Sequence, residues 1–523
     1  MRLSERTSHW RGPACTVKVR RTGAMLALLC GLSVPAAAGA QEFSIGQAVP
    51  AIDQAIPDSL VDRIDFIPSI GFGVTFTDNV DFDQDAESDL FVFVRPGAQL
   101  RVLGRRINLA IDYAFEAGYS TNENGFDIRQ VGSSNLNSAN TFELVEDILF
   151  FDFNAALSRQ IIDNREATSA RDDADNNRTL VQRYLASPYL VYRFDSFAQN
   201  VTRLTAGFVR SGQTQDDDDD DNNSVTLEAR TDFVSGSAFT NFLWEFLTLY
   251  RVTDVGDDDE ITEFTTFFGT ETPIVRQFSV LANIGYDDVD RNRGRELDGV
   301  RWDLGFTTRP SQNFTLTFTG GQRYGEANYF GALRYEITPG SILTADYRRT
   351  FDTEETVFLE DLSFLGVDPQ GQLIDLRTGE PTDVDTESFG ITDRAFFRDR
   401  FDTNLILDRR RNVYRFAAFW EEREFIDGPD DTESSYGGVA TWSRQLSRDT
   451  AGNVGFEYRV VDFGEEEAGR EDTRYTGRVT LTHALGRGFS LSGNYLYRLQ
   501  QSTFDDEDGI SENAVTIRLT KTF

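Results

Sequence analysis

The sequence predicts an all-β protein: a transmembrane, antiparallel β-barrel of the outer-membrane type with about 22 strands, within a range of about 20 to 24. Three observations predict this fold. The chain opens with a segment that has the pattern of a secretory signal, short stretches of alternating apolar and polar residues follow, and the last stretch ends on Phe523. Successive side chains of a strand point to opposite faces, so each stretch has one apolar and one polar wall.

The first forty residues have the pattern of a signal peptide. Five arginines and one lysine precede an apolar run that ends at the small residues Ala38-Gly39-Ala40. The run is too short to span a bilayer. A lipoprotein signal with Cys30 as the lipidated residue is the alternative, but the large side chain of Leu29 stands where that signal has a small one. We therefore expect residues 1–40 to be removed.

Removing the signal changes the composition. Both cysteines lie within residues 1–40, so the remaining chain has no thiol, which excludes disulfides, zinc–cysteine sites and thiol catalysis. Six of the 51 basic residues and one of the 86 acidic residues are also lost, so the formal net charge moves from −35 to −40. Such a chain repels nucleic acid, whose binding requires basic residues that neutralise phosphate.

The remaining chain shows no linker that divides it into globular domains. Residues 41–63, which include Pro50 and Pro57, are expected to form an irregular periplasmic lead-in, and residues 64–523 the barrel. No window of about eighteen apolar residues follows the signal, so no helical membrane span is expected there.

Alternation defines the expected strands in chain order. In a barrel of this class the apolar walls face lipid, the polar walls face a watery lumen, and aromatic rings gather at the membrane interfaces. The same pattern in the core of a large soluble β-protein is the alternative. The expected apolar walls are Phe66, Ile70, Phe72, Val74 and Phe76; Ile107, Leu109, Ile111, Tyr113 and Phe115; Phe242, Trp244, Phe246 and Tyr250; Phe278, Val280, Ala282, Ile284 and Tyr286; Phe314, Leu316 and Phe318; Tyr475, Val479 and Leu481; Phe489, Leu491, Gly493, Tyr495, Tyr497 and Leu499; and Val515, Ile517, Leu519 and Phe523.

Two kinds of connection set the topology. Barrels of this class have short turns in the periplasm and longer loops outside, so both chain ends are expected in the periplasm. The short connections are residues 104–106, 146–147, 195–199, 310–313, 338–341, 409–412, 447–451 and 486–488. The mostly longer, acidic connections are residues 78–89, 162–177, 216–223, 254–260, 351–387, 427–433, 464–472 and 505–512.

Residues 64–194 resemble a known family. The matching segments are Thr77-Asp78-Asn79-Val80, Glu87-Ser88-Asp89, Pro96-Gly97, Gly104-Arg105-Arg106 with Asn108-Leu109, Glu143-Leu144-Val145-Glu146-Asp147 with Phe150-Phe151-Asp152, and Ala186-Ser187-Pro188-Tyr189-Leu190. With these, the chain resembles the outer-membrane proteins associated with the PEP-CTERM and exosortase system, which are similar to the β-barrel porins of exopolysaccharide gene clusters. The resemblance implies a surface-polysaccharide or biofilm-matrix setting, and it supplies no catalytic residues.

The C-terminal Phe523 is similar to the signal that barrel-assembly machinery reads in such proteins. Lys521 departs from that signal, because an aromatic or apolar residue is more usual at its position. The resemblance therefore implies the barrel-assembly machinery as a partner through the last strand.

No catalytic, cofactor-binding or metal-binding residues are expected. A Ser-His-Asp site needs a histidine, and the one histidine beyond the signal, His483, has the lipid-facing parity. A single histidine also excludes a histidine-rich metal site. Asp81, Asp83 and Asp85 have the first ligand spacings of a calcium loop, but Ala86 and Val92 stand where glycine and the closing glutamate are needed. The run 216–221 is expected to be a solvated loop tip, although bridging of divalent ions to lipopolysaccharide stays open.

The polar walls carry mixed charge, which either tunes selectivity or braces the barrel. A barrel of this size is too wide to be filled by wall side chains alone, and the loop 351–387 is the candidate to constrict it. The charged lumen residues are Asp346, Arg348, Glu457, Arg459, Arg478 and Arg498.

The sequence thus predicts a non-enzymatic barrel of the bacterial outer membrane that serves exopolysaccharide export or a biofilm-matrix, exosortase-type system. The alternative is a general diffusion porin for small solutes, and an outer-membrane hydrolase is disfavoured by the missing histidines. The expected partners are membrane lipid and lipopolysaccharide, the assembly machinery through Phe523, and a polysaccharide.

Overall fold

The computed structural model of the 523-residue chain describes its strands and much of its loops. The predicted signal, residues 1–40, and the lead-in up to residue 62 lie outside the described residues, as does the acidic run 216–221. The described residues are 63–121, 135–163, 165, 177–211, 222–254, 260–291, 297–367, 373–376, 380–381, 390–392, 394–426, 431–464, 469–503 and 509–523.

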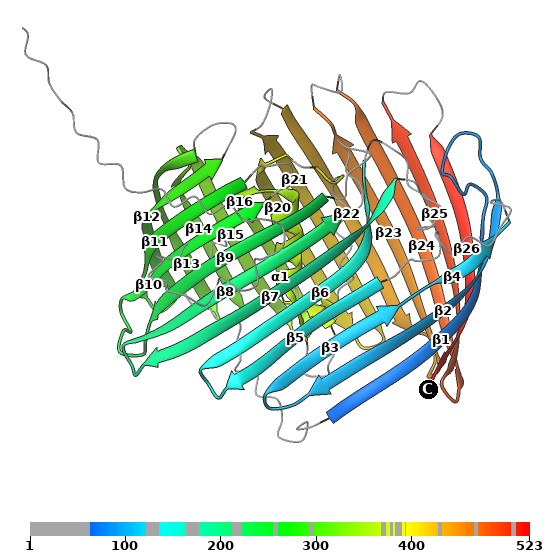
Figure 1. Ribbon diagram of the computed structural model, residues 1–523, viewed down its shortest axis with the longest axis horizontal. Helices are drawn as coiled ribbons and strands as arrows, with labels where there is room; N and C mark the ends of the chain where they lie inside the picture. Colours follow the sequence, from blue (N-terminus) through cyan, green and yellow to red (C-terminus); the bar gives the residue numbers. More distant parts are fainter. Residues whose placement is uncertain are drawn as a thin grey trace, which may run out of the picture. The chain divides into compact units, whose positions relative to one another are not determined.

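The strands form one closed antiparallel ring (Figure 1). The sheet has 23 strands, but β3 and β4 pair with successive stretches of the same strand, β2, and so occupy one place. The ring therefore has 22 places, and the predicted fold is confirmed. The first and last strands close it, with pairing that runs from Ser69 opposite Thr522 to Thr77 opposite Ala514. Closure satisfies backbone groups that an open edge would leave unpaired.

The ring strands lie close to the expected positions. Their bounds are β1 (Arg63–Thr77), β2 (Asp89–Leu103), β3 (Ile107–Ala114), β4 (Ala117–Ser120), β5 (Asn135–Val145), β6 (Leu149–Ile161), β7 (Arg178–Phe194), β8 (Ala198–Ser211), β9 (Asn222–Ser235), β10 (Leu243–Asp254), β11 (Glu260–Val275), β12 (Phe278–Arg291), β13 (Leu297–Ser311), β14 (Phe314–Arg323), β15 (Glu326–Thr338), β16 (Ser341–Asp352), β20 (Phe396–Arg409), β21 (Asn412–Phe425), β22 (Asp431–Gln445), β23 (Thr450–Asp462), β24 (Glu471–Gly486), β25 (Phe489–Ser502) and β26 (Ile510–Thr522). Between β16 and β20 lie the helix α1 (Glu354–Ser363) and a small sheet of β17 (Leu365–Val367), β18 (Leu373–Asp375) and β19 (Glu380–Pro381).

The predicted apolar walls lie on the outside of the ring. In β1, Phe66 and Phe72 are 63% and 56% exposed, whereas Thr77, of the opposite parity, is buried. The last two strands repeat the pattern, with exposed Leu491 and Ile517. An apolar outer surface with a polar inner one is the arrangement that a bilayer requires of a barrel. None of the helices in the described part of the chain is long and apolar enough to cross a membrane.

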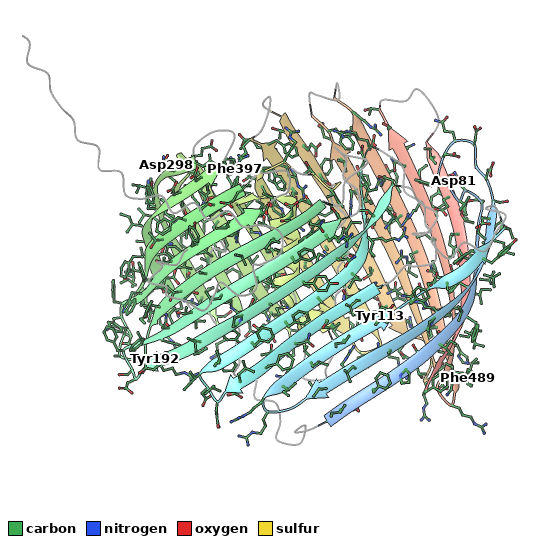
Figure 2. All side chains as sticks on the ribbon, viewed as in Figure 1. Asp81, Tyr113, Tyr192, Asp298, Phe397 and Phe489 are labelled. Carbon is green, nitrogen blue, oxygen red and sulfur yellow. The ribbon has the colours of Figure 1, made fainter. Side chains whose placement is uncertain are left out.

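The two ends of the ring differ in their connections. Ten short connections, residues 104–106, 146–148, 195–197, 236–242, 276–277, 312–313, 339–340, 410–411, 446–449 and 487–488, share one end with the C-terminus. Tyr192 and Phe489 lie at that end and Asp81 and Asp298 at the other (Figure 2).

One connection departs from the expected topology. At the end of the long loops, β14 and β15 are joined by the two residues Tyr324 and Gly325, with φ of 53° and 82°. Both values are positive, as a tight hairpin turn requires. Because this turn carries no acidic run, the loop pattern of the sequence did not mark it.

Candidate functional site

The lumen-facing wall carries the charged residues that the sequence predicts. Asp346, Glu457, Arg478 and Arg498 all have lumen parity, and Glu457 pairs with Arg459 at 3.1 Å. Arg348 instead pairs with Glu360 of α1, at 3.2 Å. The charged wall is therefore partly engaged with the loop that enters the lumen.

The helix α1 forms inside this loop because its ends are capped. Thr353 is the N-cap, and its side chain accepts a hydrogen bond from the backbone N–H of Thr356, whose hydroxyl accepts one from the N–H of Thr353 in return. Two carboxylates, Glu354 and Glu355, occupy the first turn. Reciprocal capping satisfies backbone donors, and negative charge near a helix N-terminus is favourable.

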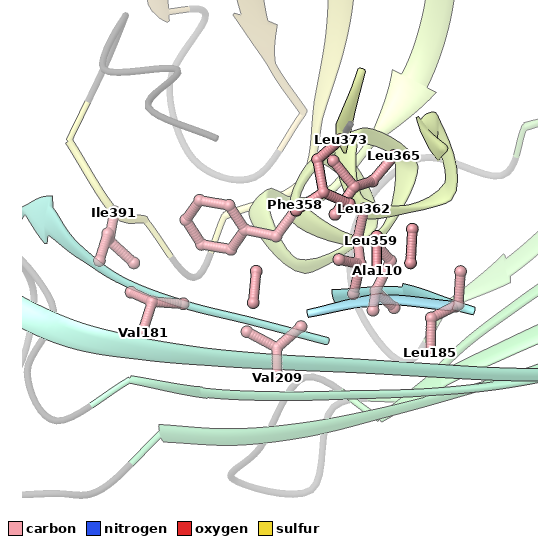
Figure 3. Close-up of a cluster of buried hydrophobic side chains, with 12 residues drawn as sticks. Ala110, Val181, Leu185, Val209, Phe358, Leu359, Leu362, Leu365, Leu373 and Ile391 are labelled. Atoms are coloured by element: carbon pink, nitrogen blue, oxygen red, sulfur yellow. The ribbon is translucent and has the colours of Figure 1, made fainter. Parts of the chain in front are cut away.

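One face of α1 packs on the wall formed by β5 to β8. Its apolar side chains Phe358, Leu359 and Leu362 are buried in one cluster with wall residues (Figure 3). The wall residues of this cluster are Ala139, Ala156, Val181, Leu185 and Val209 of β5 to β8, together with Ala110 of the neighbouring strand β3. Small residues on this wall leave room for the helix, since a Cβ at Gly207 would lie 2.3 Å from Leu359 Cδ1.

The wall also binds the end of α1 through a polar side chain. Asn154 in β6 donates a hydrogen bond of 2.9 Å from its amide nitrogen to the carbonyl oxygen of Leu362. The last carbonyls of a helix have no intrahelical partner, so this bond satisfies one of them. In addition, the guanidinium of Arg183 lies over the ring of Phe358, 5.3 Å from its centroid.

The acidic side of α1 faces β16, β20 and β21. Glu354 lies 2.8 Å from Arg423, and Glu360 lies 3.2 Å from Arg348 and 3.7 Å from Arg398. Behind this contact, the fully buried Glu421 pairs with the three arginines Arg398, Arg400 and Arg423. Burial raises the pKa of the Glu354 carboxyl, although the guanidinium of Arg423 opposes the rise.

The loop ends of β16 and β20 lie inside the ring. Phe351 and Phe397 have outward parity, yet they are buried in one cluster with Ile261, Val289 and Leu297. These three have lumen parity on β11, β12 and β13. An aromatic side chain of outward parity can contact the inner wall of other strands only when its own strands lean into the lumen. Pairing of β15 with β16 accordingly stops at Gly331 opposite Tyr347.

Together these contacts cross the lumen. Eight strands, β8 to β15, separate β7 from β16 on the shorter way around the ring, so the two walls that hold α1 lie on opposite sides. Further loops meet above them: Ile391 N–H donates to Ile162 O at 3.0 Å, and Arg165 lies 3.8 Å from Glu433. The expected constriction by the loop 351–387 agrees with this arrangement.

Sequence reasoning missed the arginine cluster that anchors α1. Arg398, Arg400 and Arg423 lie on alternate residues of β20 and β21, next to the longest loop. The sequence did carry a signal for this cluster: several arginines of lumen parity lie beside a long loop. Buried arginines need carboxylate partners, so this pattern indicates acidic residues nearby. Two of the partners, Glu354 and Glu360, come from the loop itself, and a third, Glu421, lies on β21.

The remaining sequence candidates lie elsewhere. His483 has outward parity on β24, and its Nδ1 lies 2.9 Å from the Thr450 hydroxyl. Asp81, Asp83 and Asp85 lie in the loop between β1 and β2, where the Asp83 N–H donates to Asn79 Oδ1. Within the described ranges, no group of three or more His, Cys, Asp or Glu side chains is placed to hold a metal ion.

Comparison with known proteins gives structural likenesses but no family. No known family matches the chain, and no curated protein matches it. The chain is similar to a mutant of the ferric enterobactin receptor PfeA from Pseudomonas aeruginosa, with 10% identity, a TM-score of 0.47 and coverage of 88% of this chain and 81% of that one. It is also similar to the FrpB iron transporter from Neisseria meningitidis, with 8% identity, a TM-score of 0.48 and coverage of 88% and 82%.

The geometry of the chain itself defines its class. A closed antiparallel ring with an apolar outer surface, a polar lumen and short turns at one end is the architecture of outer-membrane β-barrel proteins. Inside this barrel, a helix-bearing loop is held between opposite walls of the lumen.

Proposed function

We propose that this protein is a non-enzymatic outer-membrane channel gated by α1, and that its cargo is an exopolysaccharide or another biofilm-matrix polymer. The observation that carries the channel proposal is the position of α1, which packs on β5 to β8 and pairs with arginines of β16, β20 and β21. In this proposal, gating releases one of the two sets of contacts while the strands stay paired.

The choice of cargo is supported by the sequence resemblance of residues 64–194 to outer-membrane proteins of exosortase-type systems. The inner wall also suits a hydrophilic cargo, since it presents hydroxyl, amide and guanidinium groups such as those of Thr75, Gln99 and Arg478. In this proposal both chain ends are periplasmic, lipid and lipopolysaccharide surround the barrel, and the assembly machinery reads the strand that ends at Phe523.

A general diffusion porin for small solutes is the second candidate. Gln99 and Arg478 favour it, because both have lumen parity and are exposed, so part of the inner wall is accessible. A porin of this kind needs a permanently open path. The proposed channel conducts only when α1 leaves its seat, by which we mean its position between the wall of β5 to β8 and the arginines of β16, β20 and β21.

Planar-bilayer recording tests the proposal. We expect the purified wild-type chain to show low conductance with brief openings, because α1 occupies the lumen. A large, steady and weakly selective current from the wild type would favour the porin and contradict gating. For the cargo, deletion of the chain from its native host should lower surface polymer and leave polymer in the periplasm; unchanged surface polymer would contradict the export role.

A further inference from the structure

Two arginines meet on the inner wall where the ring closes. Arg95 of β2 and Arg518 of β26 flank β1, and the pairing places Arg95 opposite Gly71 and Arg518 opposite Gly73. A Cβ at Gly71 would lie 3.4 Å from Arg518 Cδ and 3.5 Å from Arg95 Cβ. The two side chains therefore converge over a glycine, where the wall itself adds no side chain.

Their charge is poorly compensated. Glu116 lies 3.7 Å from Arg95, which is a long ion pair. The side chain of Arg518 has no carboxylate or hydrogen-bond partner among the described residues, and its Nε is buried. The charged neighbours that act on Arg518 are Arg95, which repels it, and Glu116, which attracts it.

Arg101 is a lumen arginine that is paired far better. Arg101, also on β2, donates to both carboxylate oxygens of Asp112 at 2.6 and 2.7 Å. A buried guanidinium nitrogen without an acceptor is costly, and two nearby guanidinium groups repel each other. In a chain with a formal net charge of −35, this pair is a local excess of positive charge.

We propose that Arg95 and Arg518 form a subsite for an anionic group, such as a carboxylate, on a cargo that passes through the lumen. A planar carboxylate accepts charge-assisted hydrogen bonds from the guanidinium fork, and one anion between the two arginines removes their repulsion. This inference rests on the proposed channel function and specifies the cargo further: a polymer with acidic residues, such as a polyuronate.

Calorimetric titration of the full folded chain in detergent, at low ionic strength, tests the subsite. The probe is tetragalacturonic acid, and its methyl ester is the uncharged control. We expect the acid to bind more tightly than the ester. Arg518→Gln and Arg95→Gln should each weaken binding of the acid by about tenfold or more, because each removes a charge-assisted contact. Arg101→Gln is the matched control and should leave the affinity within about twofold.

Equal binding of acid and ester, or no binding of either, would overturn the proposal, as would unchanged affinity in Arg518→Gln. Each variant is first checked for the heat-dependent gel mobility of a folded barrel. If one glutamine variant does not fold, the other, together with a salt titration of the wild type, still decides. The gating recordings use small ions, so a failed subsite leaves the channel proposal to stand or fall by its own test.

Discussion

The carboxylate of Glu354, in the first turn of α1, lies 2.8 Å from a guanidinium nitrogen of Arg423 in β21. Both side chains are almost fully buried, at 6% and 4% exposure. Removing two charges from water offsets much of their attraction, so such a pair fixes a position more than it adds net stability. The pair determines where α1 sits, while the apolar contact with β5 to β8 supplies the larger driving force.

Reversing the charge of this contact should release α1. In Glu354→Arg, a second guanidinium would face Arg423 and Arg398, which the seated position of the helix cannot accommodate. We expect the open fraction of single channels to rise at least about tenfold, which corresponds to a loss of about 1.4 kcal/mol. Single-channel recording in planar bilayers measures this fraction.

The control for charge reversal is Glu457→Arg. Glu457 also pairs with a lumen arginine, Arg459 at 3.1 Å, but its contact does not involve α1. The change in charge is identical, so this variant should keep the wild-type open fraction. Similar currents from both variants would mean that lumen charge, and not the seat of α1, sets conductance.

Filling the space under α1 should have the same effect without a change of charge. A methyl group in Gly207→Ala would lie 2.3 Å from Leu359 Cδ1 and 3.2 Å from its Cγ, so the whole leucine side chain must move. Overpacking of this kind costs about 1 to 3 kcal/mol. Longer or more frequent openings are expected, whereas Gly493→Ala, where a Cβ meets nothing within 4 Å, should match the wild type. Unchanged openings in Gly207→Ala would show that contact with β8 does not hold α1 in its closed position.

Conductance should also depend on pH through Glu354. Burial raises its pKa in the seated helix, with Arg423 and Arg398 opposing and Glu421 reinforcing the rise. The seated state therefore binds the proton more readily than the released state, and seating is favoured below the ordinary pKa. As pH rises through the raised pKa, this contribution is lost and openings increase.

The comparison that isolates this group is Glu354→Gln, recorded across the same pH series. Glutamine resembles the protonated carboxyl, so this variant should stay largely closed and lose the part of the pH dependence that lies above the ordinary pKa. An identical pH profile in wild type and variant would assign the dependence to other groups.

Deleting Phe523 should impair assembly. The backbone N–H of Phe523 donates to Pro68 O at 3.0 Å, which extends the pairing of β26 with β1. The residue is 72% exposed at the end of the barrel. The variant loses both this closing bond and the proposed recognition signal. We expect less folded barrel in outer-membrane fractions, scored by heat-dependent gel mobility. Deletion without loss of folded barrel would exclude a role for the terminal aromatic residue.

The strands were predictable because alternation is local. In β25, the outward parity of Leu491 and Tyr495 can be read within a few residues, and the lipid environment imposes the same rule on every strand. The expected number of about 22 strands agrees with the 22 places of the ring, although the turn at Tyr324 and Gly325 was not among the expected connections. The same alternation predicted that Glu457 and Arg478 face the lumen.

The seat of α1 was not predictable in this way. The helix has ten residues, too few for a reliable helical pattern, and its partners are distant in sequence: Ala156, Val181 and Gly207. Each partner is an unremarkable small or apolar residue within its own strand. The inward lean of β16 and β20 was hidden too, because Phe351 and Phe397 have the parity of lipid-facing residues and are buried only by that lean.

The central claim is that alternate residues of each strand face hydrocarbon and water, and spin labels at Leu491 and Ser492 test it most directly. In the reconstituted barrel, oxygen, which concentrates in lipid, should relax the label at residue 491, and a water-soluble nickel complex should relax the label at residue 492. Equal access of the nickel complex to both positions would contradict the barrel and every proposal built on it.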